Sequence, residues 1–150
     1  MPAWVRIRRA TAADLRGIVA VERASFRADA WPREAFAALM DECPRLFLVA
    51  TIAGRIAGYA SAVADATRAE LVSIAVHPRD RRRGVARALM TRAIALLRGK
   101  GVSQFWLTVR PANADAIRLY QSFGFVHVRR VRDYYRRGQD GKRMRLSLAE

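Results

Sequence analysis

The sequence predicts an α+β fold, with a mixed, mostly antiparallel sheet, a parallel strand pair at its centre and helices on its flanks. Three observations predict it. A strand and two helical segments come first, three β-prone runs follow, and a helix–strand–helix series leads to two final β-prone runs. A helix between two strands favours a parallel pair, whereas a short turn makes neighbouring strands antiparallel. The length of 150 residues, with no repeat or linker-like stretch, predicts a single domain over residues 1–150.

The first part of the chain carries the start signals of two helices. Thr11 followed by Asp14 is typical of a helix N-terminus. Pro32 suits the first turn of a helix that cannot continue past Pro44. The expected elements are a strand over residues 5–9, a helix with an apolar stripe from Leu15 to Phe26, and a short helix between Pro32 and Pro44.

Turn residues divide the rest of the chain. Ala53-Gly54-Arg55 predicts a hairpin, and the polar residues 65–70 predict a connection. Glycine and basic residues at 98–101 are typical of a helix C-terminus, whereas Asn113 and Gly124 mark the ends of another helix. The expected elements are strands over residues 46–52, 56–63, 71–76, 104–109, 125–131 and 143–148, with helices that begin at Gly84 and Asn113.

Charge is the unusual property of this chain. It has 28 Lys+Arg against 13 Asp+Glu, a net charge of +15, and only Lys100 and Lys142 are lysine. The excess predicts an anionic partner, because arginine forms planar bidentate contacts with phosphate or carboxylate. The nucleotide composition of a genome explains the bias toward arginine equally well. A field of this size favours polyanions such as RNA without identifying a ligand.

The number of cysteines and the hydropathy of the chain indicate the cellular compartment in which the protein works. Cys43 is the one cysteine, so it has no partner for an internal disulfide, and its neighbours are not typical of a metal site. No apolar run approaches the roughly 18 residues of a membrane helix, and the N-terminus lacks the apolar segment of a signal peptide. We therefore expect a cytoplasmic protein with no membrane partner. Its oligomeric state is left between monomer and homodimer.

The sharpest local feature is Arg81-Arg82-Arg83-Gly84-Val85-Ala86, which lies between a predicted strand and a predicted helix. The first N–H groups of a helix have no intrahelical partner, and the helix dipole places positive charge there, so a pyrophosphate can bind them. Gly84 and Ala86 would let the backbone approach oxygen atoms closely. A solvated basic turn that caps an ordinary helix is the alternative interpretation.

These residues resemble the GNAT superfamily of N-acetyltransferases, whose acetyl-CoA loop has the form Q/R-x-x-G-x-G/A between a strand and a helix. Arg81, Gly84 and Ala86 occupy its specified positions. A second set of segments is similar to the RimI-type (ribosomal-protein) N-terminal acetyltransferases. It comprises Leu107–Asn113, Ala116–Tyr120 and Phe123–Phe125, with Tyr134-Tyr135, Asp140-Gly141 and Met144 resembling the closing hairpin.

The resemblance implies acetyl-CoA as cosubstrate, no metal, and a GNAT fold. Tyr120 would be the general acid, and backbone N–H groups in the strand that ends at Val76 would hold pantetheine and polarise the thioester carbonyl. A gap between the strand ends at Val76 and Val109 would admit the cofactor arm. The cofactor-binding residues that it implies are Ile74, Ala75, Val76, Arg81, Arg82, Arg83, Gly84, Val85, Ala86 and Asn113.

The chain departs from the RimI-type pattern at the residue expected to be the general base. RimI-type sequences usually have a glutamate at the position of Thr108, and threonine is not a general base. Glu70, at the start of the preceding strand, is the nearest substitute in the sequence, and its alternative is an exposed carboxylate. Tyr120 has an alternative too, since a tyrosine on an amphipathic helix is commonly a core residue with a wet tip. His77 and His127 are expected to have structural roles.

The acceptor side is predicted from aromatic residues and charge. Phe26, Trp31, Tyr134 and Tyr135 are candidates for substrate binding, and the three tryptophans are expected mainly to pack. Residues 129–145 hold eight basic and two acidic residues, which would attract an acidic peptide or a ribosomal RNA neighbourhood if this hairpin borders the acceptor slot. A solvated strand face is the alternative interpretation.

The resulting hypothesis is an acetyl-CoA-dependent N-acetyltransferase acting on a protein N-terminal α-amine, with ribosome association through the basic surface. The alternatives are a GNAT enzyme that acetylates a small-molecule amine or a lysine side chain, and a non-catalytic ribosome- or RNA-binding module with this fold. The phosphate loop argues against the module, because RNA binding needs distributed charge and stacking aromatic residues.

Overall fold

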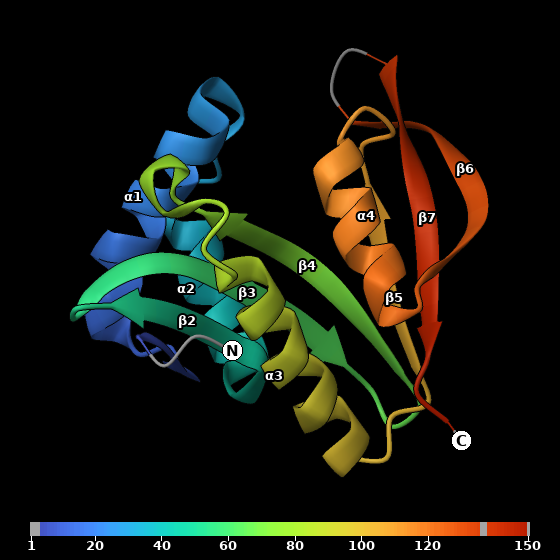
Figure 1. Ribbon diagram of the computed structural model, residues 1–150, viewed down its shortest axis with the longest axis horizontal. Helices are drawn as coiled ribbons and strands as arrows, with labels where there is room; N and C mark the ends of the chain where they lie inside the picture. Colours follow the sequence, from blue (N-terminus) through green and yellow to red (C-terminus); the bar gives the residue numbers. More distant parts are fainter. Residues whose placement is uncertain (1–3, 136–137, 150) are drawn as a thin grey trace. The chain divides into compact units, whose positions relative to one another are not determined.

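The computed structural model describes residues 4–135 and 138–149 (Figure 1). Its internal contacts group the chain into two compact units. The first unit comprises residues 1–63 and 72–96, and the second comprises residues 64–71 and 97–150. The prediction of a single domain over the whole chain stays a prediction.

The elements follow the predicted order and form one seven-stranded sheet with the strand order β1-β2-β3-β4-β5-β7-β6. β4 pairs with β5 in parallel, and the other recorded strand pairs are antiparallel, so the predicted α+β class with its parallel pair is confirmed. The helices and strands are β1 (Val5–Arg9), α1 (Leu15–Phe26), α2 (Arg33–Glu42), β2 (Phe47–Ile52), β3 (Arg55–Ala64), β4 (Arg68–Val76), α3 (Val85–Gly99), β5 (Gln104–Val109), α4 (Ala114–Phe123), β6 (Val126–Tyr135) and β7 (Gln139–Ser147).

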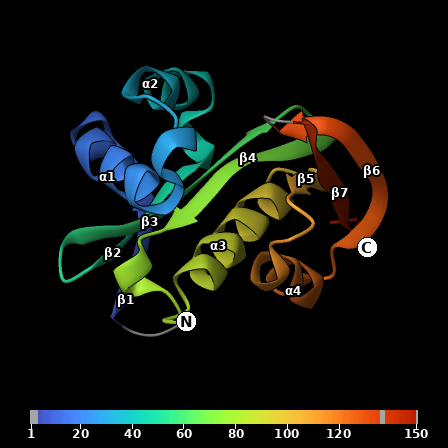
Figure 2. The same ribbon diagram turned by 90° about the horizontal axis from the view of Figure 1, so that it is seen from above.

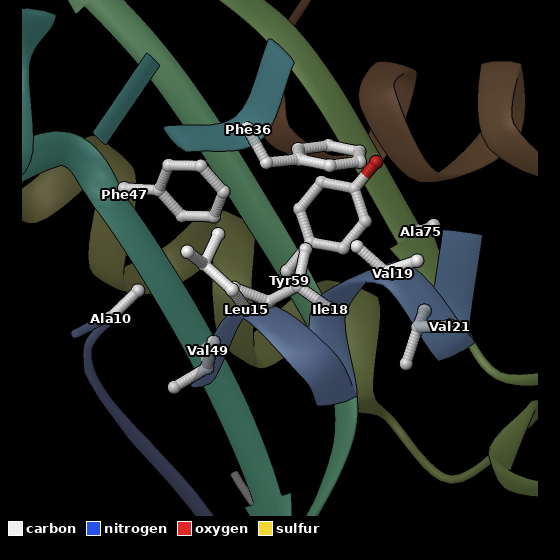
Figure 3. Close-up of a cluster of buried hydrophobic side chains, with 10 residues drawn as sticks. All are labelled: Ala10, Leu15, Ile18, Val19, Val21, Phe36, Phe47, Val49, Tyr59 and Ala75. Atoms are coloured by element: carbon white, nitrogen blue, oxygen red, sulfur yellow. The ribbon is translucent and has the colours of Figure 1, made fainter. Parts of the chain in front are cut away.

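The first unit packs its helices on a mostly apolar sheet. β2 is buried along its whole length, as expected for a strand covered on both faces. In Figure 2, α1 and α2 lie on one side of β2 and β3, and α3 lies on the other. The rings of Phe36, Phe47 and Tyr59 meet in the centre of this core, with centroids 5.3 to 6.3 Å apart (Figure 3). A buried aromatic cluster of this kind holds α2 against the sheet.

The second unit is built on the alternation of β5. Phe105, Leu107 and Val109 are buried, whereas Gln104, Trp106 and Thr108 on the other face are only half-buried. The buried face meets the aromatic residues around α4: the ring of Phe125 is 5.7 Å from that of Phe105 and 5.7 Å from that of Tyr120. The strand therefore separates an apolar side that faces the helix from a polar side.

Four expectations about local structure were wrong. The polar connection over residues 65–70 ends early, because Asp65 accepts hydrogen bonds from the N–H groups of Thr67 and Arg68 (2.8 Å each) and β4 begins at Arg68. β6 continues to Tyr135 rather than ending at residue 131. β7 begins at Gln139 rather than at residue 143. Phe26 does not join the apolar stripe, because it is 43% exposed at the end of α1. The expected packing holds for Trp31, whose ring centroid lies 6.0 Å from that of Phe36 although the residue is 39% exposed, and Trp4 is 47% exposed.

Among the helices of the described residues, none is both long and apolar enough to span a bilayer.

Candidate active site

The loop before α3 has the shape of an anion cradle. Arg82 and Gly84 both adopt positive φ, 62° and 78°, and the segment from Arg81 to Gly84 is exposed. Alternating left-handed residues turn successive backbone N–H groups toward one side, which is how backbone nests bind anions. α3 then begins at Val85 with no acidic residue in its first turn. The local geometry thus fits a pyrophosphate, and the positive φ of Gly84 is one that a side chain would strain.

A buried carboxylate holds this loop in place. Asp80 is fully buried, and its two oxygens accept hydrogen bonds of 2.7 and 2.9 Å from the guanidinium of Arg55. Arg79 lies 3.3 Å and Arg83 3.7 Å from the same carboxylate. Burial alone would raise the pKa of Asp80, but the hydrogen bonds and charges of Arg55 and Arg79 lower it below the ordinary carboxyl value. Asp80 is therefore an anion that anchors the loop on its N-terminal side.

The end of β4 meets the same loop. The carbonyl of Val76 accepts hydrogen bonds from Ser25 Oγ (3.2 Å) and from Arg81 Nε (3.3 Å). Gly58 on β3 allows the backbone to approach closely, since a Cβ there would lie 2.8 Å from the carbonyl oxygen of Ala75. Ala75 is buried, and Ile74 is half-buried. The predicted cofactor residues Ile74 to Ala86 are thus brought together in the first unit.

A polar network in the first unit was missed by the sequence analysis. Glu22 is 2% exposed, and its carboxylate accepts hydrogen bonds from the hydroxyl of Tyr59 (2.6 Å) and the backbone N–H of Trp31 (2.9 Å). The Tyr59 hydroxyl is also 2.6 Å from Ser73 Oγ. Burial, followed by the charge of Glu22, raises the pKa of Tyr59 far above that of an ordinary phenol.

The signal for this network was present in the sequence. Glu22 lies four residues after Ile18, so it falls on the apolar stripe of the first predicted helix, and a carboxylate there needs buried partners. Its bond to the Trp31 backbone fixes the segment between α1 and α2. Of the two predicted acceptor-side aromatic residues of this unit, Phe26 ends α1 and Trp31 lies within that segment.

In the second unit, Tyr120 is a buried phenol. It is 5% exposed, and burial, followed by the nearby Tyr135, raises its pKa well above the ordinary value. Within the part of the chain that the structure describes, its hydroxyl has no hydrogen-bond partner. Tyr120 therefore keeps its proton at neutral pH.

The carboxylate of Glu70 is paired with an arginine. Its two oxygens accept hydrogen bonds of 2.5 and 2.8 Å from the guanidinium of Arg143, which also donates to Thr108 Oγ1 at 3.2 Å. The predicted base and the threonine that replaces the usual glutamate are thus joined by one arginine. Arg143 is itself only 15% exposed, so this pair is partly shielded from solvent.

The remaining predicted residues have local roles. Asn113 caps α4, since its side-chain oxygen accepts a hydrogen bond from the N–H of Ala116 (3.2 Å). Tyr135 points inward and donates to the Thr108 carbonyl (3.3 Å); burial and the neighbouring Tyr134 raise its pKa to about 12. Tyr134 is 53% exposed. His77 Nδ1 accepts from the N–H of Arg79 (3.2 Å), which supports its predicted structural role.

Among the residues that the structure describes, no group of three or more His, Cys, Asp or Glu side chains is placed to hold a metal ion. The basic hairpin at 129–145 is described except for residues 136–137, which lie outside the described residues.

Comparison with known proteins identifies the family of this chain. Residues 14–125 match the model of the acetyltransferase (GNAT) family. The chain belongs to the GNAT acetyltransferase family. The resemblance seen in the sequence is therefore confirmed, and the chain is an N-acetyltransferase whose cosubstrate is acetyl-CoA.

Individual GNAT relatives refine the comparison. The chain is 38% identical over 105 residues to the [ribosomal protein bS18]-alanine N-acetyltransferase of Escherichia coli K12, covering 70% of each chain. It is 29% identical to an N-alpha-acetyltransferase of Sulfurisphaera tokodaii, covering 95% of this chain and 93% of the relative.

Solved structures of related acetyltransferases have the same fold as this chain. The Escherichia coli ribosomal-protein-S18-alanine N-acetyltransferase superposes with a TM-score of 0.87 at 32% identity, covering 97% of this chain and 95% of that chain. Ard1 from Thermoplasma volcanium superposes with a TM-score of 0.93 at 28% identity, covering 99% and 100%.

Proposed function

We propose that this enzyme transfers an acetyl group from acetyl-CoA to the N-terminal α-amine of a protein in the cytoplasm. The similarity to a ribosomal-protein alanine N-acetyltransferase and to an N-alpha-acetyltransferase supports this acceptor. The main structural support for this proposal is the bidentate pairing of Glu70 with Arg143. This pairing occupies the predicted general base, and an α-amine needs less assistance from a base than a lysine side chain does.

The acceptor must lose a proton before it can attack. An α-amine with a pKa near 8 is roughly one-tenth neutral at pH 7, a free-energy cost of about 1.4 kcal/mol, whereas a lysine near 10.4 costs about 4.6 kcal/mol. Thr108 cannot accept this proton, and both oxygens of Glu70 already accept hydrogen bonds from the guanidinium of Arg143. A site with so little basic assistance suits an α-amine better than a lysine side chain.

The cosubstrate would be held by the first unit. The backbone N–H groups from Arg81 to Ala86 would bind the pyrophosphate, with the N-terminal end of the α3 dipole behind them. N–H groups of β4 near Ile74 and Val76 would bind the pantetheine arm and polarise the thioester carbonyl. Acetyl-CoA supplies an acyl group on a thiol leaving group. The gap expected between the strand ends at Val76 and Val109 stays a prediction, because these ends belong to different units.

The proton for the departing thiol would come from Tyr120. Burial keeps this phenol protonated, and its hydroxyl is not committed to a described neighbour. The raised pKa also makes Tyr120 a weaker acid than a free phenol, so full proton transfer before the carbon–sulfur bond breaks is unfavourable. Tyr120 therefore acts best by donating a hydrogen bond that strengthens as negative charge grows on sulfur.

Aromatic residues would border the acceptor. In the first unit, Phe26 ends α1 and Trp31 lies in the following segment, where its N–H donates to Glu22. In the second unit, Tyr134 and Tyr135 lie at the end of β6. Asn113 would contact the cofactor through the part of its side chain that does not cap α4. These assignments and the association of the basic surface with ribosomes are proposals.

Mass spectrometry tests the acceptor class. The enzyme is incubated with acetyl-CoA and three acceptors: a peptide with a free N-terminal alanine, the same peptide N-terminally blocked but carrying a lysine, and a small diamine. We expect the acetyl group on the α-amine of the first. Modification of the lysine or the diamine alone would overturn the acceptor. If calorimetry shows no binding of acetyl-CoA, transfer to an α-amine and transfer to a small amine or lysine are both refuted. The alternative of a non-catalytic ribosome- or RNA-binding module then remains.

A further inference from the structure

The face of β5 that points away from α4 gathers three arginines around one tryptophan. The guanidinium carbons of Arg68, Arg143 and Arg145 lie 4.5, 4.8 and 5.4 Å from the ring centroid of Trp106. We call these four residues the Trp106 cluster.

The strand register explains why they share a face. Trp106 on β5 is paired with Arg145 on β7 and with Glu70 on β4. Arg68 and Arg143 lie two residues from these partners on the same strands, and residues two apart point to the same side of a sheet. Three strands from distant parts of the sequence therefore bring the guanidiniums and the indole together.

The charge on this face is only partly neutralised. Both oxygens of Glu70 accept hydrogen bonds from Arg143, and the Asp65 carboxylate interacts electrostatically with Arg68 without forming a salt bridge. Arg68 and Arg145 form no salt bridge with any residue the structure describes. Stacking on an indole orders a guanidinium without consuming its N–H donors, so the edges of Arg68 and Arg145 stay available for bidentate contact with an anion.

We propose that the Trp106 cluster is a carboxylate-binding subsite that selects acceptor polypeptides with acidic residues close behind the acceptor amine. This inference rests on the proposed function, in which the amine is delivered near Glu70 and Thr108. Trp106 lies two residues along β5 from Thr108, about 7 Å, and the position paired with Arg68 lies about 14 Å away. An extended acceptor would place its second to fifth side chains over that distance.

A carboxylate fits this face better than a nucleic acid does. Single-stranded RNA binds through bases stacked on free aromatic faces as well as through phosphates. The indole of Trp106 already packs against guanidinium groups, so it offers little free surface to a base. Paired, planar guanidinium edges at strand spacing match carboxylates carried on alternate residues of an extended peptide.

Steady-state kinetics with matched peptides tests the subsite. Three peptides share an N-terminal alanine and the same length and carry, at positions two to five, aspartate, asparagine or lysine. We expect kcat/KM to be highest for the aspartate peptide, about tenfold above the asparagine peptide, and lowest for the lysine peptide. The preference for aspartate should fall as salt rises, because added ions screen charge pairs.

The double variant Arg68→Gln/Arg145→Gln should bring the aspartate-to-asparagine ratio close to one. The matched control is Arg92→Gln/Arg98→Gln, which removes the same charge from exposed positions of α3, outside the strands that carry the Trp106 cluster. The control should keep the ratio. Equal loss in both variants would show that net charge alone steers the acceptor and would overturn the subsite. Acetyl-CoA affinity measured on both variants verifies their folding.

Two further measurements separate this inference from the proposed function. Fluorescence anisotropy of labelled, acetyl-blocked peptides measures acidic selectivity even if no peptide is acetylated, and the absence of selectivity in that assay would overturn the subsite by itself. Competition between poly(U) and polyglutamate of equal charge distinguishes the macromolecules. Stronger inhibition by poly(U) that the Arg68→Gln/Arg145→Gln variant abolishes would assign the face to RNA and refute the acidic-peptide subsite.

Discussion

Each unit of the chain gathers three arginines around one side chain, but the centres differ in kind. In the first unit Arg55, Arg79 and Arg83 surround the buried carboxylate of Asp80. In the second, three guanidiniums surround the neutral indole of Trp106. A carboxylate cancels part of the charge it orders, whereas an indole orders guanidiniums without cancelling any.

The difference indicates two ways of preparing a site for anions. Around Asp80 the arginines are structural, and the anion cradle is made by the backbone of the following loop, with positive φ at Arg82 and Gly84. Around Trp106 the guanidinium edges themselves remain for a ligand. Substitutions should therefore act through loop shape in the first unit and through side-chain chemistry in the second.

The largest expected effect concerns catalysis in the second unit. Tyr120→Phe removes the hydroxyl that would stabilise the departing thiol and should lower kcat by about a hundredfold, with little change in KM for acetyl-CoA. Stopped-time assays across acetyl-CoA concentrations measure both constants. An unchanged kcat would return Tyr120 to the role of a core tyrosine packed on Phe125.

Loop shape in the first unit gives the next largest effect. Gly84→Val places a β-branched residue at φ 78° and should weaken acetyl-CoA binding by about tenfold to a hundredfold, since such strain costs about 1 to 3 kcal/mol. Calorimetry gives the affinity. Gly99→Val, at the other end of α3 with nothing within 4 Å of its Cβ position, is the control and should bind normally. Retained affinity in Gly84→Val would contradict the cradle.

Removing the charge at the centre of the first cluster should act mainly on stability. Asp80→Asn leaves Arg55 without its bidentate anion, and we expect the free energy of unfolding to fall by about 2 to 3 kcal/mol, with weaker acetyl-CoA binding as the loop loosens. Asp41→Asn, on the exposed side of α2, is the matched control. Urea unfolding compares the three proteins, and equal stability would show that Asp80 does not anchor the loop.

The smallest effect is a pH dependence from the same carboxylate. Because the folded-state pKa of Asp80 lies below its ordinary value of 3.8, its contribution is present above that value and is lost as pH falls through the folded-state pKa. The stability difference between wild type and Asp80→Asn should therefore shrink on acidification below about pH 4. Thermal unfolding measured from neutral to acidic pH tests this, and a constant difference would contradict it.

Local signals predicted much of the fold correctly. The strands at Val5–Arg9 and Gln104–Val109 have the predicted ends, and Asn113 and Gly124 begin and end α4 as expected. Each of these features depends on residues within a few positions of one another. The start of β4 was missed because Asp65 completes its turn within three residues, a detail that composition alone does not reveal.

The candidate site was predicted unevenly for the same reason. The loop before α3 is a local motif, and its residues were identified from spacing. Glu22 was missed because its partners, Tyr59 and the Trp31 backbone, lie outside its helix. The pairing of Glu70 with Arg143 spans 73 positions, so no local pattern could show that the candidate base is held by an arginine.

The sequence by itself determined the order of helices and strands, the phosphate-binding loop and membership of the GNAT family, because hydrophobic period, turn residues and helix caps act over short distances along the chain. Only the tertiary structure decided which charges meet. Strand register placed three arginines on Trp106, and one of them, Arg143, also pairs with Glu70. Asp80 and Glu22 are buried and bind partners outside their own elements, and such contacts between distant segments exist only after the chain has folded.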